Sequence, residues 1–103
     1  MEIRRIQGGE LPAAMDLCRR VVLEFEAPED PEGVEAFDAY LANAEQVNSL
    51  TVFAAWEGSR PMGVLAAEGS HIALFFVDPA FHRQGIGRLL FQAYLAEGGR
   101  GRI

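Results

Sequence analysis

Three runs of strand-forming residues, separated by glycine–serine pairs, constrain the fold of this chain more than any other feature of its sequence. The runs span Leu50–Trp56, Met62–Ala67 and Ile72–Val77, and the separating pairs are Gly58-Ser59 and Gly69-Ser70. Short glycine-containing connections between such runs are typical of consecutive antiparallel hairpins. Because the third run, IALFFV, shows no polar alternation, we expect it to be the most buried strand, with both faces covered.

Apolar residues that recur at helical spacing predict two helices ahead of these strands. The first covers residues 11–25 and follows a weak strand candidate at Glu2–Gln7. The second begins at Pro31 with Asp30 as its N-cap, because aspartate before a proline is typical of a helix start. Its apolar stripe consists of Val34, Phe37 and Leu41.

A third helix is predicted after the strands. Its apolar stripe consists of Ile86, Leu89, Leu90 and Ala93, and Gly98-Gly99 stands where glycine commonly ends a helix. The order of strand, two helices, three strands and helix predicts an α+β fold, a mixed and mainly antiparallel sheet with helices on both faces. At 103 residues the chain has the length of one domain, so residues 1–103 are assigned to a single unit.

Composition and charge exclude several classes of function. The net charge of −6 argues against general nucleic-acid binding, because a phosphate backbone needs a basic surface. No apolar run approaches the ~18 residues of a membrane helix, and no signal-peptide apolar region follows Met1. The single cysteine, Cys18, excludes an internal disulfide, and no spacing of cysteine and histidine indicates a metal site. We therefore expect a cytoplasmic protein without a membrane or nucleic-acid partner.

The segment between the third strand and the third helix, residues 78–88, is the candidate binding site. A helix N-terminus presents unpaired N–H groups and the positive end of the helix dipole, so it attracts anions. Gly85 and Gly87 allow a ligand to approach the backbone, and Arg83 and Arg88 add positive charge beside it. The pattern favours a phosphate or pyrophosphate held by backbone amides, and a purely structural glycine-rich turn accounts for it equally well.

Two common phosphate motifs do not fit this segment. A P-loop needs a lysine, and the chain contains none. A dinucleotide-binding fingerprint needs a third glycine or alanine near Leu90 and an acidic residue about 20 positions further on. The chain provides neither.

The stretch FFVDPAFHRQGIGRLL, residues 75–90, resembles the acetyl-coenzyme A signature of the Gcn5-related N-acetyltransferases, the GNAT family. That signature consists of an apolar strand, a Val-x-Pro step and Arg/Gln-x-x-Gly-x-Gly/Ala at the start of a helix. Val77, Pro79, Gly85 and Gly87 match it. The resemblance implies a GNAT-like fold and an N-acetyltransferase that uses acetyl-CoA as cosubstrate and a small-molecule or peptide amine as acceptor.

By position, the resemblance also implies which residues contact the cofactor. Backbone N–H groups of residues 83–88 would hold the pyrophosphate, and the backbone of residues 75–77 would pair with the pantetheine arm like an added β-strand. An N–H group of that strand would lie near the thioester carbonyl, where negative charge develops. The implied cofactor-binding residues are Phe75, Phe76, Val77, Arg83, Gln84, Gly85, Ile86, Gly87 and Arg88.

The sequence departs from the family pattern in two ways. His82, followed by Arg83, occupies the Arg/Gln position of the signature. The family fold continues past the third helix with a splayed strand, a helix and a closing hairpin, so we expect this chain to be truncated after that helix. Because that region supplies the tyrosine acid and often a carboxylate base, no catalytic residue is assigned.

The expected truncation leaves an alternative function open. The chain would then be a non-catalytic remnant of the fold, which binds coenzyme A or another chain without turnover. The exposed edge of the IALFFV strand also leads us to expect a homodimer.

Other chemically active residues have plain structural interpretations. We expect His71 and His82 to be surface residues, Cys18 and Tyr94 to be core residues, and Asp78 to turn the chain after the strand. The acidic stretch over residues 24–38 is interpreted as a solvated face. Attraction of a cationic amine by Glu24, Glu26, Glu29 or Asp30 is the alternative.

Overall fold

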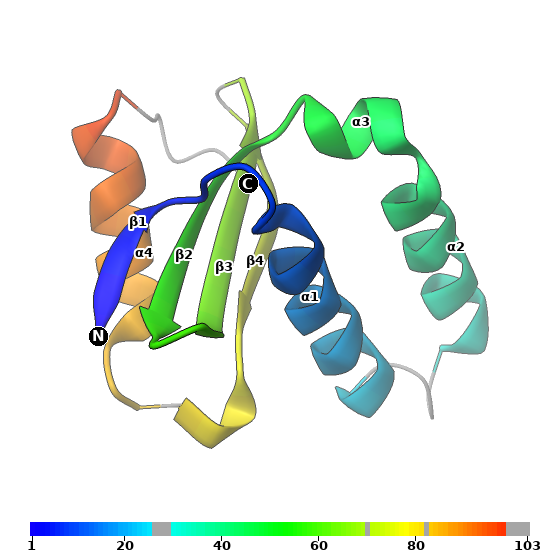
Figure 1. Cartoon of the computed structure of the whole chain (residues 1–103). Helices are drawn as coiled ribbons and strands as arrows, with labels where there is room; N and C mark the ends of the chain where they lie inside the picture. Colours follow the sequence, from blue (N-terminus) through cyan, green and yellow to red (C-terminus); the bar gives the residue numbers. More distant parts are fainter. Residues whose placement is uncertain (26–29, 70, 82, 99–103) are drawn as a thin grey trace.

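A computed structural model of the chain describes residues 1–25, 30–69, 71–81 and 83–98 (Figure 1). The described residues form one antiparallel sheet in the order β1-β2-β3-β4, with helices on both faces. The strands are β1 (Glu2–Arg5), β2 (Thr51–Glu57), β3 (Arg60–Glu68) and β4 (His71–Val77). The helices are α1 (Leu11–Phe25), α2 (Pro31–Ala42), α3 (Ala44–Asn48) and α4 (Ile86–Ala96), with a 3-10 turn, η1, at Pro79–Phe81. The predicted α+β fold is confirmed.

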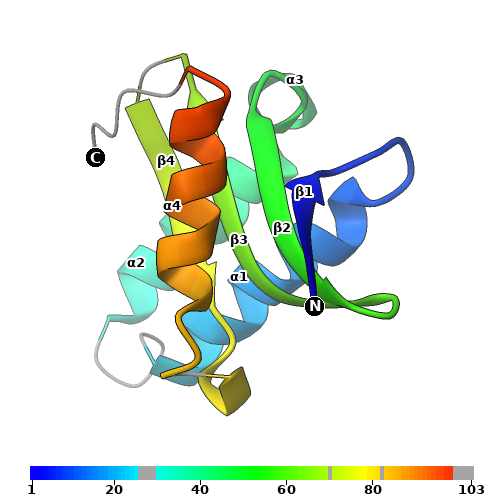
Figure 2. The same cartoon turned by 90° about the vertical axis from the view of Figure 1, so that its left-hand side faces the viewer.

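The sheet separates two hydrophobic clusters. In Figure 2, α4 lies in front of the strands, and α1 and α2 lie behind them. Because successive strand residues point to opposite faces, Val52 packs into the cluster beneath α1 and Phe53 into the cluster beneath α4. Because helices cover both faces of the sheet, the strands carry apolar residues at successive positions and show little polar alternation.

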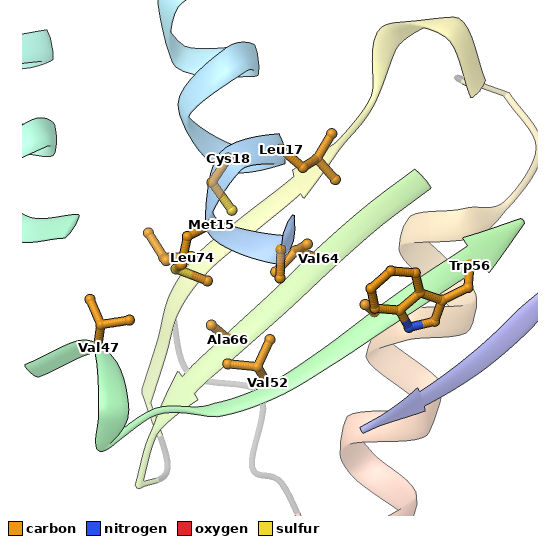
Figure 3. Close-up of a cluster of buried hydrophobic side chains, with 11 residues drawn as sticks. Met15, Leu17, Cys18, Val47, Val52, Trp56, Val64, Ala66 and Leu74 are labelled. Atoms are coloured by element: carbon orange, nitrogen blue, oxygen red, sulfur yellow. The ribbon is translucent and has the colours of Figure 1, made fainter. Parts of the chain in front are cut away.

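The cluster beneath α1 contains the single cysteine. Figure 3 shows Met15 and Cys18 of α1 directed toward strand residues such as Leu74. The Cys18 side chain is fully buried, and this burial raises the pKa of its thiol to about 12. Cys18 is therefore a protonated core residue at neutral pH, as predicted, and not a nucleophile.

Strand β4 is not the most buried strand, so that expectation is wrong. The residues of β3 between its two ends are all buried, whereas Ile72 and Leu74 are the buried residues of β4. The reason is strand order: β3 lies between two strands, and β4 lies at the edge of the described sheet. An apolar run indicates contact on both faces but carries no information about edge position.

Local signals set the ends of the other elements. The Asp30 carboxylate accepts a hydrogen bond from the Gly33 N–H at 2.9 Å, so the predicted N-cap of α2 is confirmed. The short helix α3 was not predicted; Asn43 caps it and accepts a hydrogen bond from the Gln46 N–H.

Among the described helices, none has both the length and the apolar character that a membrane crossing requires.

Gly63 allows α4 to lie close to β3. A Cβ atom on Gly63 would be 2.9 Å from Cγ2 of Ile86 and 3.0 Å from Cδ1 of Leu90. Both distances are shorter than ordinary carbon–carbon contacts of about 3.5–4.0 Å. The missing side chain at this position therefore fixes how the first turn of α4 sits on the sheet.

Candidate functional site

The last three residues of β4, Phe75–Val77, lie at the edge of the described sheet. Phe75 and Val77 pack toward α4. Phe76 points to the opposite face and packs edge-to-face against Phe37 of α2, with ring centroids 5.8 Å apart. An edge strand directs alternate backbone groups away from its partner. This segment therefore has the geometry to pair with an extended ligand.

A β-bulge interrupts β4 ahead of this segment. Ala66 of β3 pairs with Leu74, whereas Ala67 pairs with Ile72, so Ala73 has no Cα partner in the register. As a result, Ile72 joins the cluster beneath α4 and Leu74 the cluster beneath α1, although they are two residues apart. Bulges of this kind bend a strand and are frequent beside active sites.

The connection from β4 to α4 contains two residues in the left-handed region of backbone space. Arg83 has φ 67° and Gly85 has φ 75°. Gly85 is the N-cap of α4 and makes no side-chain capping bond. Left-handed residues in a turn direct neighbouring N–H groups toward a common point, which is how backbone nests bind anions.

Free N–H donors remain at the start of α4. The Leu89 N–H donates to the Gly85 carbonyl at 3.0 Å, and no acceptor among the described residues faces the N–H groups of Gly87 or Arg88. The side chains of Arg83 and Arg88 are exposed. Neither forms an ion pair with another described residue, so among these residues the loop presents two exposed cations.

The two glycines of the predicted motif differ in what the fold requires of them. Gly85 adopts φ 75°, which strains any residue with a side chain. Gly87 has no such conformation, and a Cβ atom there would lie 3.7 Å from the Phe75 ring and 3.8 Å from Val77, which are ordinary contacts. The fold explains glycine at position 85 and does not explain it at position 87.

A groove runs between α2 and β4 on the other face of the sheet. Its volume is about 550 Å³, within the range of about 300–1,000 Å³ typical of small-molecule sites. Aromatic rings line it together with one carboxylate and one imidazole: Phe37, Tyr40, Phe76, Glu68 and His71. The groove thus combines an apolar wall with a single negative charge.

A residue beside the groove holds its carboxylate in place. Gln46 Nε2 donates to Glu68 Oε2 at 2.7 Å, which holds the carboxylate in place. Burial raises the pKa of Tyr40, with a smaller opposing contribution from Gln46. Although Gln46 lies near the Tyr40 hydroxyl, no described residue completes a well-directed hydrogen bond with this buried oxygen.

Sequence reasoning did not identify Tyr40 and Glu68 as site residues. They come from α2 and from the end of β3, and only the folded chain brings them beside His71 at the start of β4. His71 is exposed, as predicted, but it lines the groove. No sequence motif joins these positions.

Other predicted residues have structural roles. The Asp78 carboxylate accepts a hydrogen bond from the Ala80 N–H at 2.9 Å and turns the chain after β4. Tyr94 is buried and packs edge-to-face on Phe53. Both interpretations are confirmed.

Some residues of the acidic stretch are described by the structure, and others, together with one histidine, lie outside the described residues. Glu24 is exposed and Asp30 caps α2, whereas Glu26, Glu29 and His82 lie outside the described residues. Within the part of the chain that the structure describes, no group of histidine, cysteine and acidic side chains is arranged to hold a metal ion.

Comparisons with known proteins agree with this fold. The family model described as acetyltransferase (GNAT) domain matches residues 25–101. A GCN5-related N-acetyltransferase from Rhodopseudomonas palustris superposes with a TM-score of 0.74 at 16% identity, over 93% of this chain and 64% of that one. PaiA N-acetyltransferase from Thermoplasma acidophilum, in complex with coenzyme A, gives 0.72 at 16% identity, over 93% of this chain and 70% of that one.

A third structure, a GNAT family acetyltransferase from Brucella melitensis in complex with acetyl-CoA, gives a TM-score of 0.68 at 22% identity, over 98% of this chain and 72% of that one. The chain therefore spans between 64% and 72% of the lengths of these three structures. None of the curated proteins matches the sequence.

Proposed function

The chain belongs to the GNAT acetyltransferase domain family, and on that basis we propose that it binds acetyl-CoA and transfers the acetyl group to an amine. The observation that carries the proposal is the open first turn of α4. Gly87 lacks a side chain where its neighbours leave room for one, and its N–H has no acceptor among the described residues. A ligand that needs close access to this backbone explains both facts.

The geometry supports a pyrophosphate at this turn. The N–H groups of residues 83–88 and the side chains of Arg83 and Arg88 would bind the negative charge. The pantetheine arm would extend along Phe75–Val77 at the edge of β4, in the manner of an added β-strand. The complexes of PaiA with coenzyme A and of the Brucella protein with acetyl-CoA support the choice of cofactor.

The groove between α2 and β4 supports an amine as the acceptor. Glu68 attracts a cation, and the rings of Phe37 and Phe76 favour an apolar body beside it. Among the described residues, no arginine lines this groove. In the transfer itself the amine nitrogen forms a bond to the thioester carbonyl carbon, the carbon–sulfur bond breaks, one amine proton is lost, and the thiolate of coenzyme A is released.

Calorimetry with acetyl-CoA, followed by an assay of free thiol release with a panel of amines, tests the proposal. We expect binding, and thiol release that depends on the amine. Because Cys18 is buried, it should not react with the thiol reagent in the folded protein. Binding without turnover would favour the remnant function, and a folded sample that binds no acetyl-CoA would rule out both.

We also propose that two copies associate through the edge of β4. Within the described sheet, β3 is the neighbour of β4 on one side, and an apolar edge strand tends to pair with another strand. Light scattering across a range of protein concentrations should detect a dimer whose population falls when acetyl-CoA is added, because the cofactor would occupy the same edge. A monomer at the highest concentration would contradict this.

A further inference from the structure

One carboxylate is buried at the junction between β4 and the loop that leads to α4. Asp78 is 4% exposed. Its Oδ2 atom lies 3.6 Å from Nη1 of Arg20 on α1 and 3.5 Å from Nη2 of Arg60 on β3. Two elements that are distant in the sequence thus converge on a single acidic side chain.

The same residue fixes the backbone of the turn that follows it. The Asp78 N–H donates to the Met62 carbonyl at 2.8 Å, and the Asp78 carbonyl accepts from the Phe81 N–H at 2.9 Å. Its Oδ1 atom accepts from the Ala80 N–H at 2.9 Å. Asp78 therefore bonds to β3 through its N–H and closes the turn through its carbonyl and its Oδ1 atom.

Arg60 holds the turn from a second side. Its guanidinium carbon lies 5.1 Å from the centre of the Phe81 ring, a cation–π contact, while one of its nitrogens faces Asp78. In Figure 1 this turn lies below the sheet, between the lower ends of α1 and α4. The turn is thus tied to α1 through Arg20 and to β3 through Arg60.

Fold stability alone does not account for this arrangement. The side chains of Arg20 and Arg60 are 48% and 59% exposed, and ion pairs with such exposed partners contribute little to the free energy of unfolding. Such a network mainly fixes the position of the backbone segment that it joins. The residues it fixes, Pro79–Phe81, stand immediately ahead of the loop that carries the left-handed Arg83 and Gly85.

We infer that Asp78, with Arg20 and Arg60, is a positioning residue for the loop over residues 83–88. It holds the loop where its N–H groups can bind the pyrophosphate while β4 pairs with the pantetheine arm of the same cofactor. This inference rests on the proposed function. It adds that α1, which touches no part of the cofactor in our proposal, sets the affinity for the pyrophosphate end.

The variant Asp78→Asn tests the inference, because it keeps an oxygen for the Ala80 N–H and removes the charge that the arginines share. Two ligands separate positioning from general damage: acetyl-CoA, and S-acetylpantetheine, which has the thioester and the arm but no pyrophosphate. We expect the affinity for acetyl-CoA to fall by about tenfold or more, equivalent to about 1.4 kcal/mol. The affinity for S-acetylpantetheine should change by less than about twofold.

Asp16→Asn is the matched control. Asp16 is the other carboxylate near Arg20, at 3.7 Å, and it is exposed on α1. We expect both affinities of this variant to equal those of the wild type. If Asp78→Asn does not fold, Arg60→Gln removes one partner from an exposed position and should give the same selective loss.

Equal losses for both ligands, or no loss for acetyl-CoA in a folded variant, would overturn the inference and leave the proposed function standing. A wild-type chain that binds neither ligand would overturn both.

Hydrogen exchange gives a readout that needs no cofactor. Because Asp78→Asn keeps the acceptors of the Ala80 and Phe81 amides, faster exchange of these amides reports a turn that is held less firmly by the arginines. We expect exchange at least about tenfold faster, and unchanged exchange would also overturn the inference.

Discussion

Alanine in place of Gly87 should stabilise the ligand-free protein and weaken its binding of acetyl-CoA. Glycine is a poor helix former, and alanine at a compatible position stabilises a fold by about 0.4–1 kcal/mol. In a domain of this size that corresponds to a rise in melting temperature of about 2–6 °C. The added methyl group would occupy the approach to the N–H groups of α4, at a cost to binding of about 1–3 kcal/mol, or roughly 5- to 150-fold in affinity. Thermal denaturation and calorimetry measure the two effects.

Two further glycines provide matched controls for this prediction. Gly85→Ala should lower stability by about 1–2 kcal/mol, because the left-handed conformation is unfavourable for a residue with a side chain. Gly8→Ala should leave the affinity unchanged, since nothing lies within 4 Å of the added atom, and any gain in stability should not exceed that of Gly87→Ala. If Gly87→Ala leaves the affinity for acetyl-CoA unchanged, the open first turn of α4 has no role in binding.

Elements with local signals were predictable from the sequence. The bounds of α1 and the Asp30 cap of α2 follow from residues within a few positions of each helix end. The antiparallel order of β2, β3 and β4 follows from the glycine turns, because short connections leave adjacent strands few alternatives. Such signals act over one helical turn or one hairpin.

Features set by distant parts of the chain were not predictable. The edge position of β4 depends on which strands are neighbours in space, and α3 has only five residues and no apolar stripe of its own. The different requirements at Gly85 and Gly87 depend on a backbone angle and on the distance to the Phe75 ring. Neither the backbone angle nor this distance can be derived from the sequence Gly-Ile-Gly.

The candidate site also has one part that was predictable from the sequence and another that was not. The loop over residues 83–88, which we propose binds the cofactor, is a contiguous motif, so the amino-acid sequence alone is enough to propose its residues. The groove residues Tyr40 and Glu68, and Gln46 which bonds to Glu68, come from three different elements. The Asp78 network joins three more positions that are far apart in the chain. Contacts of this kind have no sequence periodicity.

The last prediction concerns Gly63, the close-approach position on β3. Gly63→Ala would place a methyl group 2.9 Å from Ile86 Cγ2, so α4 must move away from the sheet or distort. Overpacking of a tight contact typically costs about 1–3 kcal/mol, which corresponds to a drop in melting temperature of about 4–20 °C. Because the shift displaces the first turn of α4 relative to β4, the affinity for acetyl-CoA should fall as well.

A double-mutant cycle identifies the contact responsible. Ile86→Ala removes the Cγ2 atom that faces Gly63, so in the double variant the new methyl group loses its closest clash and keeps only the 3.0 Å contact with Cδ1 of Leu90. The cost of Gly63→Ala should therefore be smaller in the Ile86→Ala background than in the wild type, by about 1 kcal/mol or more. Additive effects in urea denaturation would show that the two positions do not compete for the same space. In that case the height of α4 above the sheet, and with it the position of the cofactor loop, is set by contacts other than this one.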